Sequence, residues 1–152
     1  MNKITFDKLL QDVASDGLGI DYGAPITDLE DITFVEGSLN LSFVDDYKWF
    51  LQTYGSLLIS NTAYCGIEAG NPKSDAEGTV LGETLAFRKL HPNLGHNYLV
   101  LINESNEWWE ILDNNSGVVY SFDPFDGDLQ RAANNFEEYL ILKLKRSAGI
   151  FE

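Results

Sequence analysis

The residue types that carry out chemistry in enzymes are few in this chain and are not spaced for it. His91 and His96 lie five positions apart, whereas two metal ligands on one face of a helix would lie four apart. We therefore interpret both histidines as ordinary loop or strand-end residues. Cys65 lies between Tyr64 and Gly66, an apolar setting without a cation to stabilise a thiolate, so we interpret Cys65 as a buried, unreactive thiol.

Two loop-like segments resemble ligand-binding loops without matching them. The run from Asp123 to Asp128 reads Asp-Pro-Phe-Asp-Gly-Asp and lacks the carboxylate spacing of an EF-hand, so we interpret it as a solvated acidic turn. The glycines between residues 66 and 82 are not followed by the Gly-Lys-Ser or Gly-Lys-Thr of a phosphate-binding loop. We predict no catalytic residue, no cofactor and no metal site, and a protein that is not an enzyme.

Composition predicts a folded, strongly acidic domain. The 152 residues include 24 acidic and 10 basic side chains, which gives a formal charge of −14, and 44% of the residues are apolar. This charge disfavours direct binding to nucleic acid or to an anionic membrane. A single cysteine excludes an internal disulfide, and no apolar stretch follows the one lysine of the N-terminus. We expect one domain over residues 1–152, located in the cytoplasm.

The spacing of apolar residues predicts the helices and strands of the first half of the chain. Residues 5–15 and 45–54 each carry apolar residues at i, i+3, i+4 and i+7 or a close variant, which predicts two helices. Segment 26–40 is ambiguous, because residues 32–35 favour a strand whereas the acidic start at residues 28–31 favours a helix N-terminus. Residues 57–59 are predicted as a short strand, and residues 80–90 favour a helix over a strand.

The second half of the chain predicts an antiparallel meander followed by a helix. Its strands are expected at residues 98–102, 107–113 and 118–122, with an acidic loop over residues 123–130. Asn135 and Glu138 have the spacing of a capping box that opens a last helix. Trp108 and Trp109 are adjacent in a strand and must point to opposite faces, so one of them should be less buried and available as a binding anchor.

The segment from Phe43 to Ser56 resembles the signature helix of the SUKH superfamily. The family pattern is roughly Leu-Pro-x-Asp-Tyr-x-x-Phe-Leu-x-x-Tyr-Gly-Gly, and this chain departs from it at Val44 and Ser56. The resemblance spans about residues 26–145 and is similar to bacterial antitoxins of the YobK type. It implies an α+β fold in which a SUKH-like antiparallel sheet packs with N-terminal, central and C-terminal helices. The motif is structural, so it carries the fold over more directly than the partner.

The resemblance implies an immunity protein that binds and silences a cognate toxin. Such toxins are often nucleases, whose surfaces are basic because they hold a phosphate backbone, and a −14 protein suits such a target. We expect a monomer or weak homodimer that makes no direct contact with nucleic acid or membrane. The candidate toxin contacts are exposed acidic and aromatic residues of the C-terminal half: Glu107, Trp108, Glu110, Asp113, Asp123, Asp126 and Asp128.

Two alternatives to the immunity protein stay open at this point. One is an intracellular regulatory scaffold, as eukaryotic members of the family are thought to be, although this chain lacks the long disordered flanks of such members. The other is a small-molecule-binding domain with its ligand in a sheet pocket lined by Trp108 or Trp109.

Overall fold

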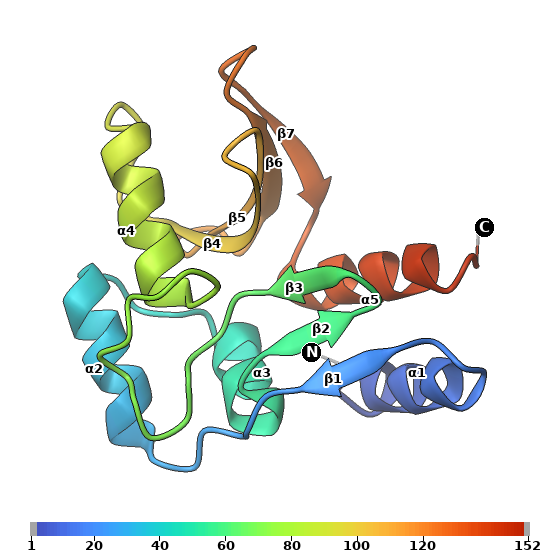
Figure 1. Ribbon diagram of the computed structural model, residues 1–152. Helices are drawn as coiled ribbons and strands as arrows, with labels where there is room; N and C mark the ends of the chain where they lie inside the picture. The colour runs from blue at the N-terminus through green and yellow to red at the C-terminus, as the bar shows by residue number, and fades with distance from the viewer. Residues whose placement is uncertain (1–2, 151–152) are drawn as a thin grey trace.

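The computed structural model describes residues 3–150 and has five helices and two antiparallel sheets in that range (Figure 1). The helices are α1 (Lys3–Ser15), α2 (Leu29–Leu39), α3 (Asp45–Tyr54), α4 (Val80–Leu90) and α5 (Phe136–Ser147). A small sheet has the order β1-β2-β3, with β1 (Ile20–Tyr22), β2 (Leu57–Ile59) and β3 (Thr62–Tyr64). A larger sheet has the order β4-β5-β6-β7, with β4 (Tyr98–Glu104), β5 (Trp108–Asp113), β6 (Val119–Asp123) and β7 (Asp128–Ala133). The predicted α+β class is confirmed.

Helix α3 organises the half of the molecule that holds the small sheet. Its inward side chains join an aromatic cluster in which the Tyr47 ring lies 5.4 Å from Phe136 of α5 and the Phe6 ring of α1 lies 6.0 Å from Tyr54. The buried Tyr47 hydroxyl donates to the backbone carbonyl of Cys65 at 2.7 Å, which satisfies its polar group. The apolar spacing of residues 45–54 therefore predicted both the helix and its buried face.

A glycine contact holds the end of α3 against the segment after β3. The backbone N–H of Ile67 donates to the carbonyl of Gly55 at 3.1 Å, and the carbonyl of Gly66 accepts from Val80 at the start of α4. A Cβ atom added at Gly66 would overlap the Gly55 carbonyl, so this close approach requires glycine. The contact joins α3, the small sheet and α4 into one core.

The ambiguous segment at residues 26–40 forms helix α2 over Leu29–Leu39, and a side-chain cap at its N-terminus favours the helix. The Asp28 carboxylate accepts from the backbone N–H of Glu30 at 2.9 Å, and acidic residues fill the first turn. Ile32, Val35 and Leu39 then fall on one buried face. The β propensity of residues 32–35 is overridden by this amphipathic pattern.

The meander has four strands, which corrects the prediction of an acidic loop over residues 123–130. Residues 124–127 form the turn, and residues 128–133 continue as β7, paired with β6 from Val119 to Asp123. Strand β7 is the edge of the sheet and buries Ala133 while its other residues stay exposed or half-buried. The last helix begins as predicted, with the Asn135 side chain accepting from the N–H of Glu138 at 2.8 Å.

Candidate protein-binding site

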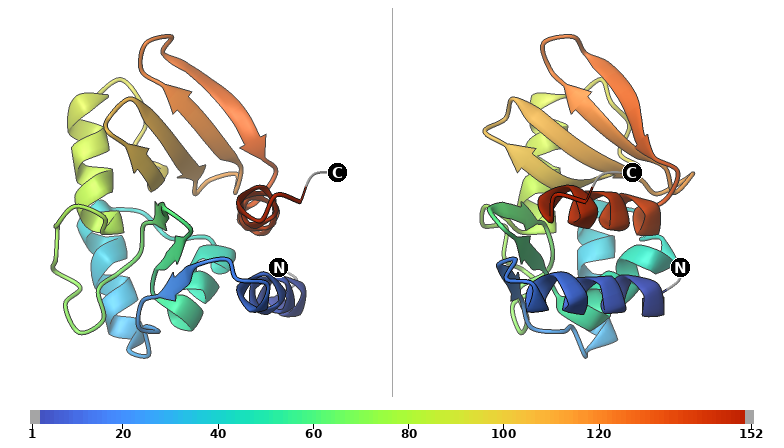
Figure 2. Two further views of the ribbon diagram at one scale, coloured as in Figure 1. Left: turned by 45° about the vertical axis from the view of Figure 1, so that its right-hand side comes forward. Right: turned by 90° about the vertical axis from the view of Figure 1, so that its right-hand side faces the viewer.

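The two faces of the four-stranded sheet differ in what covers them. Helix α4 packs on one face, where the Phe87 ring lies 4.9 Å from Trp109 and 5.7 Å from Phe122. Because neighbouring residues of a strand point to opposite faces, Trp108 and Asp123 lie on the other face. Helix α5 reaches that face at its lower end, and the upper part of the sheet, with the β6–β7 turn, rises beyond α5 (Figure 2). This upper part is the open face of the sheet.

One row of residues crosses all four strands on the open face. Glu104 of β4 pairs with Trp108 of β5, and Asp123 of β6 pairs with Asp128 of β7. The β5–β6 register places Trp108 opposite Asp123, one position beyond the paired residues Trp109 and Phe122. The row therefore sets three carboxylates and one indole side by side across the sheet.

The turns at the same end of the sheet extend this row. Glu107 lies in the turn between β4 and β5, and Phe125 and Asp126 lie in the turn between β6 and β7; all three side chains are exposed. We call the row and these turn residues the acidic end: Glu104, Glu107, Trp108, Asp123, Phe125, Asp126 and Asp128. In Figure 1 it lies at the extremity of the sheet that points away from α1 and α3.

The acidic end is electrostatically unfavourable for the isolated protein. Asp123 and Asp128 are directly opposite one another, and like charges at such positions destabilise a sheet. Across residues 3–150, the ion pairs within 4 Å lie elsewhere, and Arg131 of β7 donates to Asn134 and not to these carboxylates. A cationic partner surface would relieve this repulsion.

Five of the seven predicted contact residues come together in the acidic end: Glu107, Trp108, Asp123, Asp126 and Asp128. The expectation that one tryptophan would be less buried is confirmed, because Trp109 is fully buried and Trp108 is half-buried. The Trp108 indole N–H donates to Glu110 at 3.1 Å, which fixes the ring on the open face.

The expectation that Glu110 is exposed is wrong. Its carboxylate is buried beneath α5, where it accepts from the Tyr139 hydroxyl at 2.6 Å and lies 3.0 Å from the ammonium of Lys143. These donors replace the water that the buried carboxylate lacks. Glu110 therefore holds α5 against the sheet and is not part of the binding surface.

The structure also separates Asp113 from the acidic end. Asp113 pairs with Tyr98 at the opposite end of β5 and is half-buried. Its carboxylate accepts from the Asn97 amide at 2.7 Å, from the Asn115 N–H at 2.8 Å and from the Ser116 hydroxyl at 2.9 Å. Burial acts to raise the pKa of Asp113, but these hydrogen bonds outweigh it and leave the pKa below its usual value. Asp113 organises the β5–β6 turn.

Two members of the acidic end were absent from the predicted contacts. Glu104 was missed because its place in the row depends on the register between β4 and β5, which no local pattern reveals. Phe125 was treated as part of a solvated turn, although an aromatic residue between Pro124 and Asp126 in a turn has no core within reach. That flanking sequence was the available signal for an exposed ring.

The two histidines and the cysteine lie at separate places in the fold. His91 follows α4 and packs between the rings of Phe87 and Phe122, and burial lowers its pKa, whereas His96 is exposed. Burial raises the pKa of the Cys65 thiol to about 12, so the reactive thiolate is disfavoured at neutral pH. Among residues 3–150, no three His, Cys, Asp or Glu side chains converge on a common metal position.

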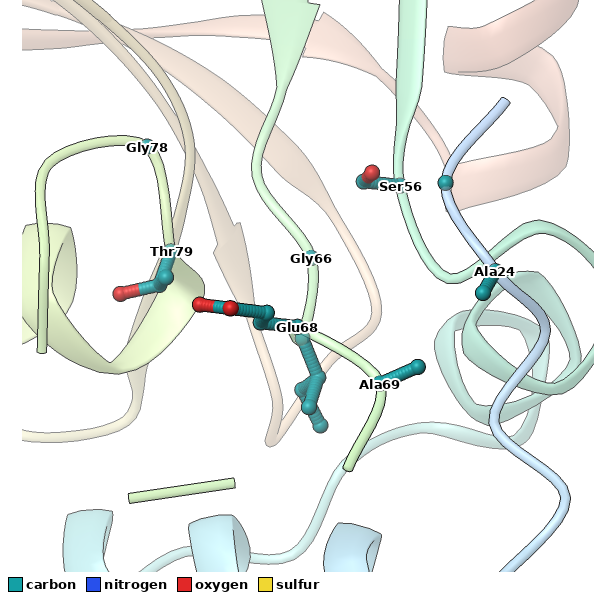
Figure 3. A pocket seen from close by; sticks show the side chains of 9 residues that line it. Ala24, Ser56, Gly66, Glu68, Ala69, Gly78 and Thr79 are labelled. Carbon is teal, nitrogen blue, oxygen red and sulfur yellow. The ribbon is translucent and has the colours of Figure 1, made fainter. Parts of the chain in front are cut away.

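The five pockets described among residues 3–150 are lined by residues other than Trp108 and Trp109. Trp109 is enclosed by Phe87 and His91. A pocket of about 360 Å³ lies beside the glycine contact, between the Gly66–Ala69 segment and Thr79. The Glu68 side chain extends toward Thr79 (Figure 3). The Thr79 hydroxyl already donates to Ala76 and accepts from Gly82, so this wall offers few free polar groups.

The fold and the acidic end together define a class: an α+β domain that presents carboxylates and aromatic rings at one end of an antiparallel sheet. A family model described as SMI1-KNR4 cell-wall, SUKH_6, matches residues 29–140. Because the match covers most of the chain, the protein belongs to this SMI1-KNR4 family of the SUKH superfamily. The comparison with curated proteins finds no match. In the described part of the chain, every helix falls short of the length or apolar content needed to cross a membrane.

Proposed function

We propose that this protein is an immunity protein that neutralises a cognate toxin by stoichiometric binding in the cytoplasm, and that the toxin is a basic nuclease. SUKH-family membership is compatible with this role. The resemblance of about residues 26–145 to bacterial antitoxins of the YobK type favours it. In this proposal the protein acts by binding alone, as a monomer or weak homodimer, without a cofactor or a catalytic step.

The observation that carries the proposal is the acidic end. Its five carboxylates have no cationic neighbour among the ion pairs of residues 3–150, and two of them face each other across β6 and β7. Charges arranged in this way increase the rate of association with an oppositely charged protein. A nuclease supplies the opposite charge, because its cleft must hold phosphates.

The test uses the toxin encoded beside the gene of this protein, expressed in cells with and without the protein. We expect the wild-type chain to restore growth and to bind the purified toxin with an association rate that falls as salt increases. The variant Asp126→Asn/Asp128→Asn should associate about 3- to 10-fold more slowly at low salt, because two steering charges are removed.

The matched control removes the same charge elsewhere. Asp12 of α1 and Asp21 of β1 are exposed, and both elements lie at the opposite end of the molecule from the acidic end. The variant Asp12→Asn/Asp21→Asn should therefore associate at close to the wild-type rate. Equal slowing by both double variants would mean that net charge alone acts and that the acidic end is not the contact. Failure of the wild-type chain to bind or protect would refute the proposed function.

A further inference from the structure

Phe125 is the most exposed large apolar side chain in the described residues. Its side chain is 83% exposed, whereas the next value is 59%, for Leu29 of α2. A phenylalanine left in water forgoes the free energy that burial would supply. Aromatic residues, phenylalanine among them, are enriched in the cores of protein–protein interfaces.

The turn holds Phe125 in this position by its own hydrogen bonds. The backbone N–H of Phe125 donates to the Asp123 carboxylate at 2.9 Å, and the N–H of Gly127 donates to the Asp123 carbonyl at 2.8 Å. Gly127 has a φ of 71°, which glycine adopts without strain, and Pro124 restricts the backbone before the ring. A side chain presented on an ordered turn loses little conformational entropy when it binds.

The charges around the ring decide which partner fits it. Asp123, Asp126 and Asp128 all lie within three positions of Phe125, so the ring is flanked by carboxylates on both sides along the chain. A second copy of this protein carries the same −14 charge and would be repelled. The fitting surface combines cationic groups with a flat apolar or aromatic platform.

Clefts that bind single-stranded nucleic acid have this combination, because they pair cations with phosphates and stack bases on aromatic side chains. We propose that the turn from Asp123 to Asp128 enters the nucleotide-binding cleft of the nuclease, with the Phe125 ring in place of a base and the neighbouring carboxylates in place of phosphates. This inference rests on the proposed function. It adds that this protein competes with the nucleic-acid substrate for the cleft, and that Phe125 anchors the complex.

The experiment measures binding to a catalytically inactive variant of the toxin encoded beside this gene. We expect Phe125→Ala to dissociate at least about tenfold faster with little change in association rate, because a buried anchor acts on dissociation whereas charges act on encounter. Phe34→Ala is the matched control, since Phe34 is also an exposed phenylalanine but lies on α2, at the other end of the molecule. Phe125→Ala should keep the wild-type unfolding temperature, because the ring is 83% exposed.

A competition measurement tests the cleft directly. Single-stranded RNA and DNA decamers are titrated against the toxin alone and against the preformed complex, and we expect the complex to exclude whichever decamer the free toxin binds. If the complex binds the decamer as well as the free toxin does, or if Phe125→Ala dissociates no faster than Phe34→Ala, the nucleotide-like role of the turn is refuted. In either case the immunity function stands if the wild-type chain still binds and protects. If the wild-type chain does not bind, or if the free toxin binds neither decamer, this inference fails.

Discussion

The buried Glu110 provides a test of how the four-stranded sheet is held against α5. The perturbation is Tyr139→Phe, which removes one hydroxyl and no other atom. That hydroxyl is fully buried and donates to the Glu110 carboxylate at 2.6 Å. Lys143 stays 3.0 Å from the same carboxylate, so the change removes one hydrogen bond and leaves the ion pair in place.

The expected loss in the free energy of unfolding is about 1.5–3 kcal/mol, the range for a hydrogen bond to a charged group. For a domain of this length, 1 kcal/mol lowers the unfolding temperature by roughly 2–4 °C. The variant should therefore unfold about 3–12 °C below the wild type. Urea unfolding gives the free energy, and a thermal scan gives the temperature.

Tyr64 supplies the control, because its ring lies 6.2 Å from that of Tyr139 and its buried hydroxyl has no hydrogen-bond partner within residues 3–150. Tyr64→Phe should leave the free energy of unfolding unchanged or raise it, because it removes a buried hydroxyl that makes no hydrogen bond. In a Glu110→Gln background the effect of Tyr139→Phe should shrink, because the charged acceptor is gone. A full-sized loss in that background, or equal losses for the two tyrosine variants, would contradict the role given to Glu110.

Two further predictions concern stability. Gly66→Ala should destabilise the protein by more than about 3 kcal/mol, because its Cβ would overlap the Gly55 carbonyl. Gly37→Ala should stabilise the protein by roughly 0.5–1 kcal/mol, because Gly37 lies on the exposed side of α2 and a Cβ there meets nothing. Urea unfolding compares the two variants. Burial holds the pKa of folded His91 below its unfolded value of 6.5, so stability is complete above pH 6.5 and is lost as the pH falls toward the folded pKa. His91→Asn should reduce the difference in unfolding free energy between about pH 7.5 and about pH 5.5, and an equal reduction by His96→Asn, at an exposed histidine, would argue against this assignment.

The elements that sequence alone predicted are those whose apolar residues repeat at a clear period. Helix α3 and strands β4 to β6 bury one side or both, so their pattern is strong. Strand β7 has almost no such pattern, because an edge strand with exposed faces requires no apolar alternation. Segment 29–39 forms a helix because Asp28 caps its first turn and its apolar residues share one buried face. The β propensity of single residues takes neither effect into account.

The candidate site was predictable in composition but not in arrangement. Acidic residues were visible as a group, yet the row from Glu104 to Asp128 exists only through the registers of three strand pairs. Glu110 looked like its neighbours because the partner that neutralises it, Lys143, is 33 positions away in sequence. Long-range pairing of this kind decides which charges face a partner and which hold the fold together.

The placement of the β6–β7 turn has an evolutionary consequence. Phe125 and Asp126 are exposed beyond the sheet, whereas the aromatic cluster around Tyr47 and Phe136 lies at the other end of the molecule. Substitutions in the turn therefore leave the buried aromatic cluster untouched, and loops of this kind tolerate change. Selection can alter this surface one residue at a time without first restoring a protein that has ceased to fold.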